Sequence, residues 1–350
     1  MRQEQTPARA FIASVRAGWN LGNTLDAMKR GRKPGETVPP LEAETAWHNP
    51  PAGRVLLRAV REAGFDALRL PVTWVQHMDP EGRVDPAWMD RVAEVVDWTL
   101  ETGMACILNV HHDAGAHGWL QAAPERHEAA GARFDGLWRQ IAERFAGVGE
   151  RLVFEAFNEM LDGREHWTQT DDDAAYAAHN RWHQRFVDTV RAAGGFNRTR
   201  LLSLQTYSAG NAPRTLAAFR MPEDPAPGRI ILQTHNYDPE GFCWLRAQGR
   251  VMRDTWGTPE DLAEVDALMA RLSAFAGRHG APLMIGEFGS EDKGNPAERA
   301  RHAAYFTGKA RAAGIPCFWW DCGSFALLDR RSGAVLQPEI VRALTGKGEG

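Results

Sequence analysis

Two glutamates each stand where an apolar run of the sequence turns polar. Glu159 directly follows the run at 151–158, and Glu287 lies in LMIGEF at 283–288. Two carboxyl groups facing each other across a pocket can cleave a glycosidic bond, because one protonates the departing oxygen while the other attacks the anomeric carbon. A lone glutamate at a strand end is more often a buried or ion-paired carboxylate. Two of them in one setting favour catalysis.

Other apolar runs also end in side chains that can ionise or bind a ligand. Polar groups that follow stretches of Val, Ile, Leu and Phe are costly to bury unless they hydrogen-bond one another or a ligand. We therefore expect these side chains to converge with the two glutamates on one polar pocket. They are Asn20, Asn23, Arg69, His111, His112, Asn158, His235, Tyr237 and Trp320.

Such convergence requires a fold that gathers strand ends in one place. Eight strand-like runs alternate with helix-periodic stretches, which is typical of βα units and a parallel sheet. A doubly wound open sheet would also give this alternation, but a barrel collects the carboxyl ends of all strands around one axis. The predicted fold class is therefore α/β, a single (β/α)8 TIM barrel. The runs lie at 13–22, 65–72, 105–112, 151–158, 201–207, 230–237, 283–288 and 317–320.

The length of 350 residues suits one such barrel. We expect a single catalytic domain over 1–350 with short tails at 1–12 and 345–350, because no linker rich in Pro, Gly or Ser divides the chain. The stretches at 50–64 and 86–103 carry apolar residues at helical spacing and end at a glycine, so they are predicted helices.

Composition and charge exclude several classes of partner. No apolar run approaches the roughly 20 residues that span a bilayer, so no membrane partner is expected. The net charge of -4 is small and the arginines are scattered, which argues against nucleic acid. The N-terminus lacks the apolar core of an intact signal peptide, so either the protein is cytoplasmic or a leader was removed. We expect a monomer.

The four cysteines are interpreted as free thiols. Three of them, Cys106, Cys317 and Cys322, lie in or beside apolar runs, where a reduced thiol packs as a small hydrophobe. A disulfide between Cys317 and Cys322 is conceivable in an exported protein, but so short a loop would have to fold back tightly. Cys243 completes the set.

Seven segments together resemble glycoside hydrolase family 5, the cellulase family of retaining barrel enzymes. They are GWNLGNTLDA at 18–27, LRLPVTW at 68–74, LNVHHD at 108–113, FEAFNEM at 154–160, HNYDP at 235–239, IGEFG at 285–289 and WWDCG at 319–323. The resemblance implies that Glu159 is the acid/base, that Glu287 is the nucleophile, and that Asn158 binds the 2-hydroxyl of the sugar under attack. In a retaining enzyme the two carboxyl groups would lie about 5 to 5.5 Å apart.

The resemblance also assigns supporting roles. Arg69 and Tyr237 would hold Glu287 ionised, whereas Glu159 would have a raised pKa suited to proton donation. His235 would bridge toward the acid/base and His111 would bind sugar hydroxyls. The resemblance also implies Trp320 as the floor of the sugar site, and His112 stands beside His111. Asn23 is a further supporting candidate at a strand end. Because a pyranose packs its apolar face on an aromatic ring, tryptophans in loop-like segments are candidate sugar platforms: Trp47, Trp119, Trp167, Trp244 and Trp256.

A metal site at His111, His112, Asp113 and His235 is the main chemical alternative, since clustered His and Asp at strand ends also occur in metalloenzymes. Adjacent histidines on a strand point to opposite faces, which makes joint ligation awkward. We predict no metal and no cofactor.

The predicted substrate is a β-glucan polysaccharide or oligosaccharide. The segments at 18–27 and 44–50 are most similar to the β-1,4-glucanase branches of the family, which favours cellulose-like or mixed-linkage glucans. Xyloglucan, xylan and mannan remain alternatives with the same chemistry. A catalytically inactive carbohydrate-binding barrel is the alternative from another class.

Overall fold

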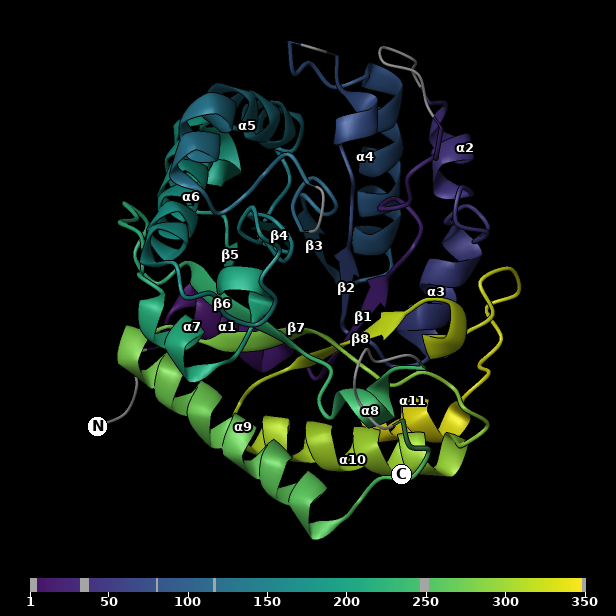
Figure 1. Ribbon diagram of the computed structural model, residues 1–350. Helices are drawn as coiled ribbons and strands as arrows, with labels where there is room; N and C mark the ends of the chain where they lie inside the picture. The colour runs from purple at the N-terminus through teal and green to yellow at the C-terminus, as the bar shows by residue number, and fades with distance from the viewer. Residues whose placement is uncertain (1–4, 32–37, 80, 116–117, 246–251, 348–350) are drawn as a thin grey trace.

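The strands of this chain are short apolar runs buried on both faces, as expected of a parallel sheet covered by helices. The computed structural model describes residues 5–31, 38–79, 81–115, 118–245 and 252–347. Within them, eight parallel strands close into a barrel in which β8 pairs with β1 (Figure 1). The predicted (β/α)8 barrel is confirmed. The strands are β1 (Ala17–Leu21), β2 (Ala67–Leu70), β3 (Ala105–Asn109), β4 (Leu152–Glu155), β5 (Leu202–Gln205), β6 (Ile230–Asn236), β7 (Leu283–Phe288) and β8 (Cys317–Asp321).

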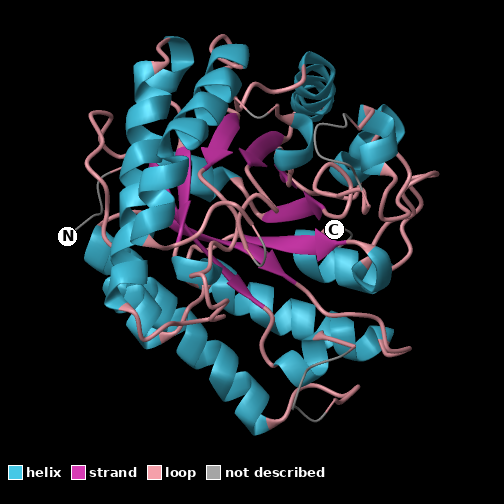
Figure 2. Cartoon of the chain, turned by 45° about the horizontal axis from the view of Figure 1, so that its top comes forward, coloured by secondary structure: helices cyan, strands magenta, loops and turns pink. Residues whose placement is uncertain are grey.

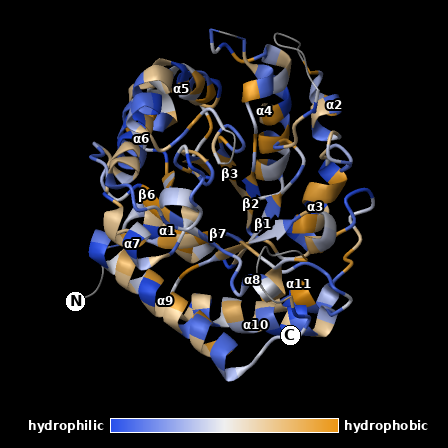
Figure 3. Cartoon of the chain, in the orientation of Figure 1, coloured by the Kyte–Doolittle hydropathy of each residue, from blue (hydrophilic) through white to orange (hydrophobic). Residues whose placement is uncertain are grey.

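Helices lie around the strands on the outside of the barrel (Figure 2). The helices predicted at 50–64 and 86–103 are found as α3 and α4. In Figure 3 the outer helices carry both hydrophobic and hydrophilic residues, as expected of helices with one buried face. The helices are α1 (Pro7–Ser14), α2 (Pro40–Glu44), α3 (Arg54–Glu62), α4 (Pro86–Glu101), α5 (Pro124–Arg144), α6 (Asp173–Ala192), α7 (Pro213–Ala218), α8 (Glu240–Cys243), α9 (Pro259–His279), α10 (Pro296–Ala312) and α11 (Pro338–Thr345), with short 3-10 turns η1 (Val75–His77), η2 (Gly195–Arg198), η3 (Tyr207–Ala209) and η4 (Gly323–Phe325).

The barrel interior changes from apolar at the amino ends of the strands to polar at their carboxyl ends. Because side chains alternate along a strand, every second residue points inward. Gly18 leaves room for the ring of Phe318, since a Cβ at Gly18 would lie 2.0 Å from it. The apolar layer includes Ala67, Ile107, Val153, Ile231, Met284 and Phe318. The polar layer consists of three pairs in register across neighbouring strands, Asn20 with Arg69, Asn109 with Glu155, and Gln205 with Gln233.

The N-terminal segment is not the tail expected at 1–12. From Pro7 onward it forms α1, whose Ala8 and Ile12 belong to the apolar cluster inside the barrel. Thr6 caps this helix by accepting a hydrogen bond of 3.3 Å from the backbone N–H of Arg9. The expectation of a tail was wrong because a segment without the apolar core of a signal peptide can still form a short amphipathic helix. A cap residue followed by proline and by apolar residues at a spacing of four predicts a short helix.

Three further expectations concern the chain as a whole. The tail expected at 345–350 begins where α11 ends, and residues 348–350 lie outside the described residues. All four cysteines are free thiols, as predicted. Among the described residues, no helix combines the length and the apolar character needed to cross a membrane.

Candidate active site

A cavity of about 630 Å³ opens at the carboxyl ends of the strands. Side chains from the ends of β3, β4, β6, β7 and β8 surround it, together with the loops that follow β4, β5 and β6. The predicted residues that line it are His111, His112, Asn158, Glu159, Trp167, His235, Tyr237, Trp244, Glu287 and Trp320.

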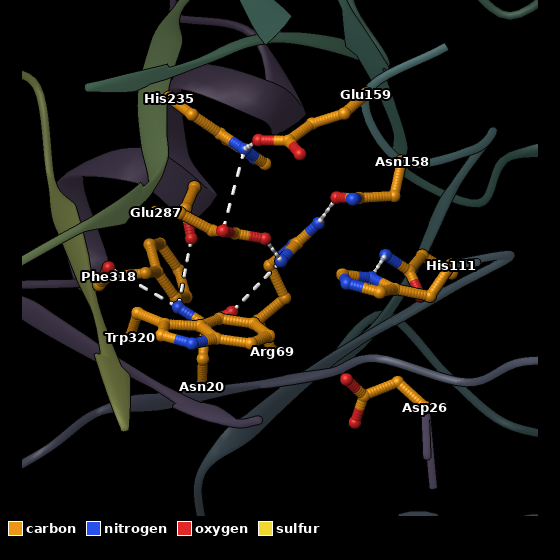
Figure 4. A network of polar contacts seen from close by, with 12 residues as sticks. Asn20, Asp26, Arg69, His111, Asn158, Glu159, His235, Glu287, Phe318 and Trp320 are labelled. Carbon is orange, nitrogen blue, oxygen red and sulfur yellow. Dashed lines mark hydrogen bonds and ion pairs between the residues drawn. The ribbon is translucent and has the colours of Figure 1, made fainter. Parts of the chain in front are cut away.

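The two glutamates face each other across this cavity (Figure 4). One oxygen of Glu159, one oxygen of Glu287 and a ring nitrogen of His235 all lie within 4.8 Å of one another. This is close to the separation of about 5 Å found in retaining glycosidases and well short of the roughly 6.5 to 9.5 Å found in inverting ones. Glu159 has a φ of 44°, a left-handed conformation that is uncommon for non-glycine residues.

The local sequence bends the chain so that the glutamates meet. The register of β6 on β7 shifts between Thr234 and His235, which places His235 opposite Glu287. Such irregularities re-aim side chains at the rims of barrels. His235 Nδ1 then lies 2.7 Å from Glu159 Oε1 and 3.7 Å from Glu287 Oε2. The histidine therefore connects the two carboxyl groups.

Arg69 organises the floor of the site with all five of its N–H groups. Nε and Nη2 donate to the two oxygens of Glu155 at 2.8 and 2.7 Å. Nη1 donates to Glu287 Oε1 at 2.6 Å and to Asn20 Oδ1 at 3.0 Å. The remaining N–H of Nη2 donates to Asn158 Oδ1 at 2.6 Å. The side-chain oxygen of Asn158 is thus engaged, which leaves its NH2 group to donate to a ligand.

Tyr237 contacts Glu287 as the resemblance implies. Its hydroxyl donates to Glu287 Oε2 at 3.0 Å, so each carboxylate oxygen of Glu287 receives one hydrogen bond. Among the described residues, neither Arg69 nor Tyr237 hydrogen-bonds Glu159. The two glutamates therefore have different surroundings, one held by two donors and the other contacted by a histidine.

Burial raises the pKa of both glutamates. The pKa of Glu159 rises to about 7, because desolvation outweighs the opposing charges of Arg69 and His112. Desolvation also raises the pKa of Glu287, against the lowering effects of His235 and Arg69. The resemblance implied that Arg69 would lower the pKa of Glu287. The pKa is raised instead, because burial outweighs the attraction to Arg69, which also pairs with Glu155.

The hydrogen bonds of His111 fix its tautomer. Asn109 accepts from the N–H of Val72 through Oδ1, so its Nδ2 must donate to Glu155 Oε1 and to His111 Nδ1. His111 therefore carries its proton on Nε2. Burial holds its pKa well below the usual range, so the ring is neutral and offers an N–H donor.

The residues considered as metal ligands have other partners. Asp113 accepts hydrogen bonds from Trp74 N–H at 2.6 Å and from the indole of Trp119 at 2.7 Å. Nε2 of His112 lies 3.5 Å from Asp26 Oδ2, and this carboxylate raises the pKa of His112 in spite of burial. In the Asp26, His111 and His112 cluster, His111 carries its proton on Nε2 and His112 faces Asp26.

The tryptophans divide between the cavity and the scaffold. Trp320 lies nearly parallel to His111 with ring centroids 5.7 Å apart, and Trp244 packs on Tyr237 at 4.6 Å. The ring of Trp167 is half exposed in the cavity. Trp47 lies beside His112, with their ring centroids 5.3 Å apart.

Four expected contributors, Asn23, Trp47, Trp119 and Trp256, are not among the residues that line the cavity. Trp119 lies beneath Arg133 and supports Asp113, and Trp256 is buried against His302. The backbone carbonyl of Asn23 accepts from Asn49, and the asparagine that contacts Arg69 is Asn20. Trp119 and Trp256 therefore do not form sugar platforms in this cavity, because a loop tryptophan can equally hold a loop in place.

Sequence reasoning missed most of the polar layer beneath the cavity. A recognisable signal was present, because each missed residue is a polar side chain inside an apolar run. In each strand these residues occupy the alternate positions whose side chains point into the barrel, as Arg69 does in β2. The missed residues are Glu155, Asn109, Gln205 and Gln233.

This combination of fold and site defines a class of protein. A closed parallel barrel whose carboxyl face presents two opposed carboxyl groups beside aromatic rings has the architecture of a glycoside hydrolase. A family model described as Cellulase (glycosyl hydrolase family 5) matches residues 32–326. The chain belongs to this family.

Curated relatives are similar over most of this chain. Endoglucanase B of Ruminococcus albus is 36% identical over 322 residues, which cover 90% of this chain and 73% of that protein. Endoglucanase A of Clostridium longisporum is 32% identical over 317 residues, with 90% and 59% covered. The chain thus spans less than two thirds of the length of the second relative.

Solved structures match almost end to end. A GH5-4 broad specificity endoglucanase of Ruminococcus champanellensis with bound cellotriose is 32% identical, with a TM-score of 0.89 and coverage of 99% and 100%. A family 5 lichenase of Caldicellulosiruptor sp. F32 is 34% identical, with a TM-score of 0.89 and coverage of 99% and 96%. A family 5 enzyme of Prevotella bryantii B14 in complex with a xyloglucan tetradecasaccharide is 31% identical, with a TM-score of 0.87 and coverage of 99% of both chains.

Proposed function

We propose that this chain is a retaining endo-β-1,4-glucanase that hydrolyses cellulose-like and mixed-linkage β-glucans, with Glu159 as acid/base and Glu287 as nucleophile. The observation that carries the proposal is the pair of carboxyl oxygens within 4.8 Å across one cavity, with a proton donor whose pKa is about 7. The similarity to endoglucanases and to a lichenase supports the choice of glucan.

The surroundings of each glutamate suit the two steps. In the first step Glu287 attacks the anomeric carbon while Glu159 protonates the departing oxygen. Arg69 and Tyr237 orient the attacking carboxylate. In the second step Glu159, now ionised, takes a proton from the water that displaces Glu287 from the sugar. Asn158 donates to the 2-hydroxyl of the same sugar, and Trp320 packs on its apolar face.

A panel of polymers tests the substrate. We expect reducing sugar from carboxymethylcellulose and mixed-linkage β-glucan, and less from xylan and mannan. Xyloglucan is the second candidate, because the similar Prevotella bryantii enzyme has been solved in complex with a xyloglucan tetradecasaccharide. Proton NMR of the first products should show the β-anomer. Binding of oligosaccharides without any turnover would instead indicate an inactive barrel.

The pKa of Glu159 predicts the alkaline limb of the activity profile. Because the acid must be protonated in the free enzyme, kcat/KM on cello-oligosaccharides should fall as pH rises through about 7. The acid limb should lie above the usual range of a glutamate, because the pKa of Glu287 is also raised. An activated aryl cellobioside provides the control, since its leaving group needs little protonation and its alkaline limb should be much weaker. Identical alkaline limbs for both substrates would exclude Glu159 as their cause.

The loops after β4 and β5 lie on the leaving-group side of the site. Glu159 follows β4 and donates toward the departing sugar, and Trp320 and His111 come from β8 and from the end of β3. Trp167 stands in the β4 loop with half of its ring exposed. Its segment is held by Asp162, a buried carboxylate that accepts hydrogen bonds from the N–H of His166 at 3.0 Å and from the hydroxyl of Thr170 at 2.8 Å. Trp167 is therefore a platform for the sugar that departs.

Replacing Trp167 by alanine should harm long substrates selectively. We expect kcat/KM on cellotetraose to fall about tenfold, which corresponds to about 1.4 kcal/mol of lost contact. An aryl cellobioside, which places no sugar on that side, should be hydrolysed almost as well as by the wild type. Phe196→Ala is the matched control, because Phe196 is similarly exposed but lies in η2, outside the residues that line the cavity. Equal losses on both substrates would contradict this placement.

A further inference from the structure

His235 is contacted on its inner side by two glutamine side chains. Its Nε2 lies 3.4 Å from Gln205 Nε2 and 3.2 Å from Gln233 Nε2. Its Nδ1 faces the glutamates on the cavity side, as Figure 4 shows. Which nitrogen of a histidine carries the proton is set by the hydrogen bond that the other nitrogen makes. The hydrogen bonds of the glutamines to Nε2 therefore influence whether Nδ1, the nitrogen that faces Glu159, carries a proton.

The orientation of the Gln205 amide is fixed by two independent partners. Its Oε1 accepts a hydrogen bond of 2.8 Å from the backbone N–H of Glu159, which can only donate. Its Nε2 donates at 2.8 Å to Glu155 Oε1. The carboxylate of Glu155 is an acceptor only, because its ion pair with Arg69 helps keep its pKa below the usual range in spite of burial. A flipped amide would lose both hydrogen bonds.

The second N–H of Gln205 is thus directed at His235 Nε2, which must accept it. Gln233 fits the same arrangement, since its Oε1 accepts from the hydroxyl of Ser203 at 2.8 Å and its Nε2 faces the ring. Burial lowers the pKa of His235 to about 4, so the ring is neutral over the range in which Glu159 titrates. A neutral ring that accepts at Nε2 carries its proton on Nδ1.

We propose that Gln205 is a positioning residue that fixes His235 as the neutral Nδ1–H tautomer and thereby places the transferable proton of Glu159 on Oε2. This inference rests on the proposed function of Glu159 as the acid/base. Because Nδ1–H donates to Glu159 Oε1, that oxygen acts as the acceptor. The acid proton then resides on Oε2, which has no hydrogen-bond partner among the described residues.

The consequence for the reaction follows from the oxygen that holds the proton. In the first step the Oε2 proton moves to the glycosidic oxygen as the C1–O bond breaks and a Glu287 oxygen bonds to C1. In the second step water attacks C1, its proton moves to Oε2, and the bond between Glu287 and C1 breaks. With the opposite tautomer, Nδ1 would accept a hydrogen bond from a proton on Oε1. That proton would be directed at the histidine instead of the leaving group.

Nitrogen NMR of the histidine side chains tests the tautomer directly. In protein labelled with 15N-histidine, two-bond proton–nitrogen correlations distinguish Nδ1–H from Nε2–H rings, and a His235→Gln variant assigns the signal. We expect the Nδ1–H form for the wild type at pH 6 to 8. An Nε2–H ring at position 235 would overturn the proposal, whatever the activity of the protein.

Two variants then test the role of Gln205. Gln205→Glu keeps the shape but places an acceptor opposite Nε2, and Gln205→Met removes the donor without adding a charge. Both should lower the Nδ1–H population of His235. They should lower kcat/KM on cellotetraose by about ten- to hundredfold, within the roughly 10²- to 10⁴-fold that general acid catalysis contributes. On an activated aryl cellobioside the loss should stay within about threefold, since little protonation is needed there.

Thr234→Val is the matched control on the same strand. Thr234 is buried next to His235, its hydroxyl has no hydrogen-bond partner within the described chain, and the substitution preserves its shape. It should change neither the tautomer nor the ratio between the two substrates. If both Gln205 variants keep the Nδ1–H form and the wild-type ratio, Gln205 does not fix the ring. A wild type that cleaves no polymer or aryl glycoside would instead refute the proposed function, and the NMR result would still decide the tautomer.

Discussion

Glu287→Ala is expected to show no measurable turnover of either polymer or activated aryl glycoside. No leaving group, however good, replaces the attacking carboxylate. Glu159→Ala should instead keep much of its activity on an aryl cellobioside with a good leaving group, because only proton donation is lost in the first step. Initial rates of aryl release measure this contrast.

Azide and a trapped intermediate separate the roles further. Azide can replace water in the second step without a general base, so it should accelerate Glu159→Ala and yield a β-glycosyl azide. A 2-fluoro cellobioside with an activated leaving group should label the wild type at Glu287, as read by mass spectrometry of the peptide. A label on Glu159, or first products of inverted configuration, would contradict the assignment.

Arg69→Lys should lower both stability and activity strongly. An ammonium has three N–H donors and no planar fork, so it cannot replace five hydrogen bonds to four partners. Glu155 would remain buried with an incomplete partner, and breaking such a pair typically costs about 3 to 5 kcal/mol. Chemical denaturation and kcat/KM on an aryl cellobioside measure the two effects.

Arg91→Lys separates loss of stability from loss of catalysis. Arg91 is also buried and forms a two-nitrogen contact with Glu44, but the pair joins α4 to α2 on the outside of the barrel. This control should lose stability and keep kcat/KM at temperatures where it remains folded. If Arg69→Lys behaved in the same way, Arg69 would be a structural ion pair without influence on Glu287.

The barrel and the strand-end residues could be predicted because their signals are local. Glu159 follows an apolar run, and Glu287 and His235 lie near the ends of two others. The end of a parallel strand is the mouth of a barrel. The layer below could not be assigned in the same way. Glu155 and Gln205 lie inside runs, and their partners depend on which strands are neighbours and on the register between them.

The pKa of Glu287 is a second property that could not be predicted from the sequence. Its attraction to Arg69 was predictable from residue types, but the competition of Glu155 for the same guanidinium is a three-dimensional fact. The pairing of His235 with Glu287 likewise depends on a shift in register between β6 and β7, which the residue types of β6 do not predict. Partners that are far apart in sequence therefore decided the electrostatics of the site.

The docking of α1 has a consequence for how the chain acquires its structure. Ala8 and Ile12 belong to a cluster with Val153, Met284 and Phe318, whose strands are spread along the whole sequence. Because α1 precedes all eight strands in the sequence, it has no complete surface to pack on until β8 has been synthesised. Contacts of such high sequence separation are slow to form, because a long loop must close first. The docking of α1 therefore follows closure of the barrel during translation.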